Sequence, residues 1–209
     1  MAEANKCRLR LFLQIFGDEP VIRSGHERRQ QRMLQVWKGG ATDLSTRTII
    51  EDPARWLVLS DYESGPSDMI AAETRAPILA WDLEQILPGH QVSPSGAGGV
   101  ILVSMDVDPA HEDEFNDWYN TEHIPLFLRV PGVITARRFR AHYGRPAYVA
   151  LYHVQNTGVY ATPAWMAVNT TPWILRLRKF QRNRTYFMFQ TPLYGEAYSD
   201  APDTPHASP

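Results

Sequence analysis

The order of strand-like and helix-like segments in residues 99–194 is the feature that most restricts the fold. The segment 99–107 (GVILVSMDV) alternates and is rich in β-branched residues, which predicts a strand. Asp108 and Pro109 are typical of a helix N-cap and first helical position, and they predict a helix from about 109 to 122. The remaining expected elements are strands at 132–141, 146–155 and 185–193, and a helix at 162–180 that breaks before Pro172. This β-α-β-β-α-β order is the ferredoxin-like arrangement.

The first half predicts the same order less clearly. The expected elements are strands at 8–16, 45–52 and 54–63, a helix around 25–39, and a helix at 67–87 that breaks before Pro77. A fourth strand is not evident. The segments AETRAPIL (72–79) and VNTTPWIL (168–175) each place a Thr and a Pro before Ile-Leu, which favours a diverged tandem duplication. The predicted fold class is α+β, with tandem ferredoxin-like repeats.

Composition sets the expected domains and location. Residues 1–87 and 99–194 are expected to be the two repeats, 88–98 a Pro/Gly/Ser-rich linker, and 195–209 a loose tail. The net charge of −2 indicates neither a nucleic-acid nor a membrane-surface partner, and the basic run 176–184 is expected to be a solvated helix face. Cys7 is the only cysteine, and the sequence has neither an apolar run of membrane-spanning length nor the apolar core of a signal peptide. These features predict a cytoplasmic protein.

The segment DEFNDWYNTEHIP (113–125) places a carboxylate among aromatic residues. On an ideal helix Phe115, Trp118, Tyr119, Glu122 and Leu126 share one face, with His123 at its edge. That face must cover the sheet, and a buried Glu122 requires a partner. Pro125 lacks an N–H group, so the helix is expected to end or kink at 122–123. The Glu122 and His123 side chains would then point toward a pocket at the end of the sheet.

These residues carry a resemblance to a known family. FNDWYNTEHIP, with VPGVITARRFRA and RPAYVALYHV after it, resembles the EthD-like branch of the dimeric α+β barrel superfamily over about residues 100–193. The resemblance implies a ligand cavity between sheet and helices or inside a barrel. It also implies that one chain holds two sheets that other members join by dimerising. Relatives include muconolactone-type isomerases, cofactor-free quinone-forming monooxygenases, polyketide cyclases and haem enzymes, so the fold does not fix the reaction.

Candidate catalytic residues follow from the motif and from strand geometry. His123 is the expected general base, and the alternative is a helix-end histidine that satisfies a carbonyl. Glu122 would tune His123 or pair with Arg137 or Arg138. The two arginines must point to opposite faces of the sheet, so one could bind an oxyanion while the other is solvent-facing or structural.

Other aromatic residues are expected to bind the substrate or to fill the core. Trp118 and Tyr119 are candidates for either role, as are Tyr148 and Tyr152 on one strand face, and His153 is on the opposite face of that strand. The remaining histidines are expected at the surface: His26, His90, His111, His142 and His206.

The sequence favours a cofactor-independent lyase or isomerase that acts on a small aromatic or polyketide-like compound. The alternatives are a cofactor-free monooxygenase of an aromatic substrate and a non-catalytic small-molecule-binding protein. The sequence has no GxGxxG, P-loop, GxSxG or HExxH motif, so neither a cofactor nor a metal is expected. A homodimer is the expected assembly.

Overall fold

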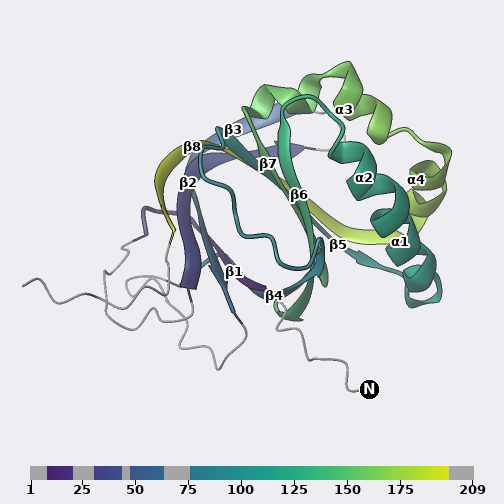
Figure 1. The fold of residues 1–209 in the computed structure, drawn as a ribbon, viewed down its shortest axis with the longest axis horizontal. Helices are drawn as coiled ribbons and strands as arrows, with labels where there is room; N and C mark the ends of the chain where they lie inside the picture. Colours follow the sequence, from purple (N-terminus) through teal and green to yellow (C-terminus); the bar gives the residue numbers. More distant parts are fainter. Residues whose placement is uncertain (1–8, 21–30, 44–47, 64–75, 198–209) are drawn as a thin grey trace, which may run out of the picture.

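Eight antiparallel strands form one closed barrel in the computed structural model, which describes residues 9–20, 31–43, 48–63 and 76–197. The strand order around the barrel is β1-β3-β2-β8-β5-β7-β6-β4 (Figure 1). The strands are β1 (Arg10–Phe16), β2 (Gln31–Asp43), β3 (Thr48–Tyr62), β4 (Leu79–Leu87), β5 (Gly99–Val107), β6 (Val133–Tyr143), β7 (Tyr148–Val154) and β8 (Gln181–Ala197).

Each half of the chain contributes four neighbouring strands. The first half forms the sheet β4-β1-β3-β2 and the second half forms β8-β5-β7-β6, so the two halves have the same internal order. Pairing of β2 with β8 and of β4 with β6 joins the sheets. One chain therefore closes the barrel, as the resemblance implied.

The described helices all lie in the second half and cover the outer face of its sheet (Figure 1). The α-helices are α1 (Glu112–Trp118), α2 (Ile124–Phe127), α3 (Pro163–Val168) and α4 (Pro172–Leu177). Short 3₁₀ turns lie at Pro109–His111, Thr157–Ala161 and Arg178–Phe180, and a π-helical turn, η2, lies at Tyr119–His123. Thr162 and Thr171 cap α3 and α4 through their side chains, and a proline follows each cap.

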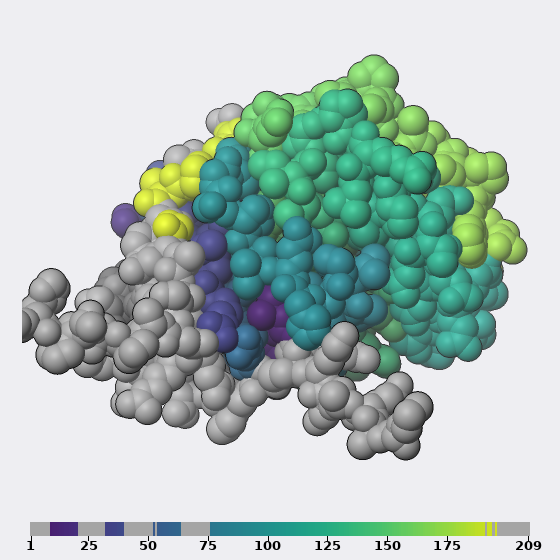
Figure 2. All heavy atoms as spheres, viewed as in Figure 1, coloured from purple at the N-terminus to yellow at the C-terminus, as the bar shows by residue number. Residues whose placement is uncertain are grey.

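The second-half sheet is buried on both faces because it separates two cores. Its inner face contributes residues such as Leu102, Leu151 and Phe189 to the core inside the barrel. Its outer face contributes residues such as Ile101 and Val103 to the core under the helices. Figure 2 shows the teal and green atoms of this half as one continuous mass.

A polar network inside the barrel holds the segment 88–98. Arg137 and Asp61 form an ion pair of 2.7 Å, and neither side chain has any exposed surface. Arg137 also donates to the carbonyl of Gln91 at 2.6 Å and to Ser93 Oγ at 3.0 Å, while the Ser93 N–H donates to Asp61 at 2.8 Å. The segment between the halves is therefore packed against the barrel interior.

Two predicted helices of the first half are wrong where the structure describes them. Residues 31–39 of the expected helix 25–39 belong to β2, and residues 79–87 of the expected helix 67–87 form β4, the fourth strand that was not evident. Residues 25–30 and 67–75 lie outside the described residues. In β2, Met33 to Trp37 are buried on both faces, so the strand lacks the alternation that identifies a half-buried strand.

Three further predictions need correction. The segments 48–52 and 54–62 belong to one strand, β3. Residues 172–175 start α4, whereas 76–79 lead into β4, so the proposed match is not structural over these residues; 72–75 lie outside the described residues. Strand β8 continues to Ala197, into the segment expected to be a tail. The tandem duplication itself stays a prediction.

Candidate functional site

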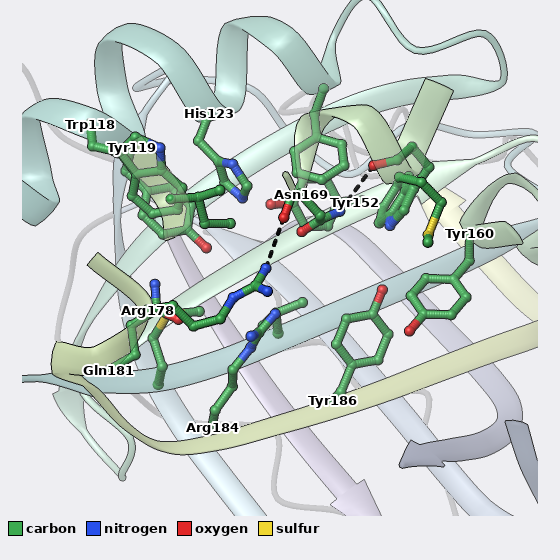
Figure 3. Close-up of a pocket in the computed structure, with 16 residues that line it drawn as sticks. Trp118, Tyr119, His123, Tyr152, Tyr160, Asn169, Arg178, Gln181, Arg184 and Tyr186 are labelled. Carbon is green, nitrogen blue, oxygen red and sulfur yellow. Dashed lines mark hydrogen bonds between the residues drawn. The ribbon is translucent and has the colours of Figure 1, made fainter. Parts of the chain in front are cut away.

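A pocket lies between the helices and the outer face of the second-half sheet (Figure 3). The space open to the centre of a water molecule is about 80 Å³. Since one water needs about 10–15 Å³ by this measure, the pocket holds a group of roughly one substituted ring. Its lining consists of Val103, Met105, Trp118, Tyr119, His123, Phe127, Tyr152, Tyr160, Trp165, Met166, Asn169, Ile174, Arg178, Gln181, Arg184 and Tyr186.

The π-helical turn places His123 in this pocket. The Ile124 N–H donates to the Tyr119 carbonyl, five residues back, so one extra residue is inserted into the turn. This insertion rotates the following residues, and His123 and Phe127 face the sheet where Glu122 and Leu126 were expected. The helix therefore does not end at 122–123, because the wide turn accommodates Pro125 and the helix continues through α2. The irregularity expected at this point is the π-helical turn.

His123 is buried among aromatic rings and carries no hydrogen bond on Nδ1 within the described part of the chain. Its side chain is 5% exposed, and its ring centroid lies 4.2 Å from that of Trp118, 4.9 Å from Tyr119 and 4.7 Å from Phe127. Burial, followed by the positive charges of Arg184, Arg138 and Arg178, holds its pKa well below 6.5. The imidazole is thus neutral at pH 7 and able to accept a proton.

The opposite wall, from β8 and the turn before it, is positively charged. Arg184 and Tyr186 project from β8, and Arg178 projects from the turn after α4 (Figure 3). Arg178 donates to the Asn169 carbonyl at 2.9 Å. None of the lining residues that the structure describes is Asp or Glu. The pocket therefore favours an anionic or electron-rich ligand.

Two tyrosine hydroxyls belong to the same pocket. Burial raises the pKa of Tyr119 and raises that of Tyr152 well above 10, and a hydrogen bond joins the two side chains. Both phenols consequently stay protonated at neutral pH. They are neutral hydrogen-bonding groups beside His123.

Arg138 packs against the Tyr119 ring and lies outside the pocket lining. It donates to Asn120 Oδ1 at 2.9 Å and to Asn116 Oδ1 at 2.5 Å, and its guanidinium lies 4.6 Å from the centre of the Tyr119 ring. Burial lowers its pKa to about 10, so it stays a cation at pH 7. Tyr148 packs against this cation and donates to Glu112. Neither Arg138 nor Tyr148 lines the pocket.

Glu122, Arg137 and His153 lie away from the pocket. Glu122 accepts from Trp118 Nε1 at 3.2 Å and from Thr171 Oγ1 at 2.6 Å, so its expected pairing with Arg137 or Arg138 is wrong. Arg137 and His153 point into the barrel, where burial and then Arg137 hold the pKa of His153 well below 6.5. Arg137 and Arg138 point to opposite sheet faces as predicted, but neither is solvent-facing.

Of the nine predicted site residues, the structure brings Trp118, Tyr119, His123 and Tyr152 together in the pocket. Sequence reasoning missed Arg178, Arg184 and Tyr186. The expected solvated helix face at 176–184 is wrong, because that run leaves α4 and enters β8. One sequence pattern could have identified Arg184 and Tyr186. They are polar residues two positions apart in an otherwise apolar strand, so their side chains leave the same face of the sheet.

The other histidines and possible metal ligands give no second site among the described residues. His111 stacks on Phe180, while His142 is exposed and pairs with Glu84. No group of three His, Cys, Asp or Glu side chains is arranged to hold a metal in the described ranges. His26 and His206 lie outside them. The pocket, which holds about one ring, does not fit a haem macrocycle.

The fold recurs in solved structures of low sequence identity. An anthrone oxidase-like protein aligns with a TM-score of 0.60 at 12% identity, over 94% of this chain and 96% of that chain. A candidate monooxygenase from Lactobacillus acidophilus NCFM aligns with a TM-score of 0.57 at 8% identity, over 91% and 96% of the two chains. A candidate monooxygenase from Fusobacterium nucleatum aligns with a TM-score of 0.53 at 8% identity, over 92% and 98%.

No protein-family model matches the sequence, and no curated protein matches it. No helix in the described part of the chain is long and apolar enough to cross a membrane. The structural likeness concerns the fold. The chain folds as a dimeric α+β barrel with two ferredoxin-like sheets, here closed within one chain.

Proposed function

We propose that this protein is an acid/base enzyme that removes a proton from a small aromatic compound, with His123 as the general base. The observation that carries the proposal is a buried, neutral imidazole in a pocket whose described lining residues include arginines and no Asp or Glu. A neutral imidazole accepts the proton, and the positive wall stabilises the enolate or phenolate that remains. Trp118, Tyr119 and Tyr152 would hold the ring.

The fate of the anion defines the reaction class. Return of the proton to another carbon gives an isomerase, and cleavage of a bond next to the anion gives a lyase. Both require no oxidant, which agrees with the prediction that the reaction needs no cofactor. The pocket volume favours a single-ring substrate over a multi-ring polyketide.

A monooxygenase is the second candidate. Three structural neighbours with the same fold carry names of oxidase-like or monooxygenase-like proteins. In this reaction the anion formed at His123 would reduce O₂, so that a CH₂ group beside the ring and O₂ give a C=O group and water. The proton-abstraction step is the same, and only the dependence on O₂ differs.

The test measures proton abstraction directly. Small enolisable aromatic ketones, such as phenylacetone and phenylpyruvate, are incubated with the protein in D₂O, and proton NMR follows loss of the acidic C–H signal. Exchange should be faster with wild-type protein, and His123→Gln should slow it by on the order of 10²–10⁴-fold. His142→Gln, an exposed histidine outside the pocket, is the matched control.

The same samples separate the alternatives. Product formation only in air indicates the monooxygenase, and equal product in air and under argon indicates the lyase or isomerase. Ligand binding without exchange in wild-type protein, or equal exchange in wild type and His123→Gln, would refute the role of His123.

A further inference from the structure

Arg184 and Tyr186 form a pair on one wall of the pocket. They are two residues apart on β8, so their side chains leave the same face of the strand. Both line the pocket, across from His123 on the helical wall (Figure 3). The proposed proton abstraction uses the positive charge of this wall, but it does not specify which ligand group Arg184 and Tyr186 contact.

Both residues carry buried polar atoms without a hydrogen-bond partner in the described structure. These atoms are the Tyr186 hydroxyl oxygen and Arg184 Nε. Tyr186 is 6% exposed, and buried polar groups in folded proteins are normally hydrogen-bonded. Two such atoms on residues that line one pocket indicate that a ligand supplies the missing partner.

The hydrogen-bonding properties of Arg184 and Tyr186 indicate which ligand group they bind. Arginine offers only donors. Burial raises the pKa of Tyr186 well above 10, so its hydroxyl keeps its proton and donates as well. The ligand group between them must therefore accept hydrogen bonds. Because Arg184 is cationic and the described lining contains no Asp or Glu, a negatively charged acceptor is favoured over a neutral one.

The size and the lining of the pocket restrict the class of ligand further. A carboxylate presents two coplanar oxygens to a guanidinium, and the remaining space holds about one ring. Phe127, Tyr160 and Trp165 also line the pocket and provide apolar ring surfaces. We propose that Arg184 and Tyr186 bind the carboxylate of a single-ring aromatic acid, whose reacting atom then lies toward His123. This deepens the proposed function and rests on it for the reaction, but not for the binding.

The experiment compares ligands of the same shape and different charge. Isothermal titration calorimetry at pH 7.5 measures binding of benzoate, of its neutral isostere benzamide and of phenyl phosphate to the full chain. Benzoate should bind at least tenfold more tightly than benzamide. Arg184→Gln should weaken benzoate binding by about 10–100-fold, because a hydrogen bond to a charged group is lost, and change benzamide binding by no more than a few-fold.

Three further variants keep the result interpretable. Arg184→Lys retains the charge and should recover part of the benzoate affinity. Tyr186→Phe should weaken benzoate binding by a few-fold to tenfold. Arg182→Gln, an exposed arginine on the same strand that pairs with Asp108, removes the same charge outside the pocket and should leave benzoate binding unchanged.

Equal affinity for benzoate and benzamide in wild-type protein would overturn the proposal, as would an equal loss for both ligands in Arg184→Gln. Tighter binding of phenyl phosphate than of benzoate would overturn the choice of a carboxylate.

The binding experiment can be distinguished from the test of the proposed function. His123→Gln should retain benzoate binding while losing exchange, and a wild-type protein that binds benzoate without catalysing exchange would refute only the enzyme proposal.

Discussion

Replacement of Asp61 by Asn tests the network inside the barrel. Asp61 accepts from Arg137 at 2.7 Å and from the Ser93 N–H at 2.8 Å, and both charged side chains are fully buried. An amide has one oxygen, so one of these two donors loses its acceptor, and Arg137 becomes a buried cation without a counter-charge. Loss of one partner of a buried ion pair costs about 3–5 kcal/mol.

The free energy of unfolding from urea titration measures this cost, with the m value as a check that the same surface is exposed. Asp52→Asn is the matched control, because Asp52 pairs with Arg55 at 2.7 Å where both side chains are about one-third exposed. That change should cost at most about 1 kcal/mol. The double variant Asp61→Leu/Arg137→Met removes both charges and should recover part of the lost stability.

A loss below about 1 kcal/mol in Asp61→Asn, equal to that of the control, would refute the reasoning. It would mean that the carbonyl of Gln91 and the other oxygens around Arg137 compensate its charge without Asp61.

Three other predictions use the buried histidines and the seam between the sheets. The unfolded chain protonates His123 and His153 below about pH 6.5, whereas burial keeps both neutral in the folded state, so acid favours unfolding. The free energy of unfolding should fall as pH decreases from 6.5, by up to about 1.4 kcal/mol per pH unit for each histidine, and His153→Gln should reduce this slope in urea titrations at several pH values. The exchange rate catalysed by His123 should be constant from pH 6.5 to 8 and should decline only at lower pH; a rise through this range with a midpoint near 7 would contradict the lowered pKa. Gly39→Ala should destabilise by at least about 1–3 kcal/mol in thermal or urea unfolding, since its Cβ would collide with backbone atoms of Met188 and Phe189 across the β2–β8 seam.

The second half of the fold could be predicted because its signals are local. Alternation in 99–107 and the Thr-Pro pairs before α3 and α4 specify their elements without reference to the rest of the chain. The segment 79–87 was ambiguous. In β4 every second side chain points into the barrel: Trp81, Leu83 and Gln85. The apolar residues of this segment also fit the spacing of a helix, so the sequence alone did not distinguish strand from helix.

The site was only partly predictable for a similar reason. The motif in 113–125 identified His123, but the π-helical turn that exchanges the positions of Glu122 and His123 depends on a single inserted residue. Arg184 and Tyr186 are brought to His123 by the pairing of β8 with β5, a contact distant in sequence. Local patterns carry no information about such pairing.

The closed circle of strands also limits how two copies of this chain can associate. Each of the eight described strands has a hydrogen-bonded neighbour on both sides over at least part of its length, so none of them is an edge strand along its whole length. Edge-to-edge extension along a whole strand is therefore closed to a second copy. The expected homodimer stays a prediction, and if it forms, most of its contact must come from side-chain surfaces, where a few charge substitutions can abolish it without unfolding the barrel.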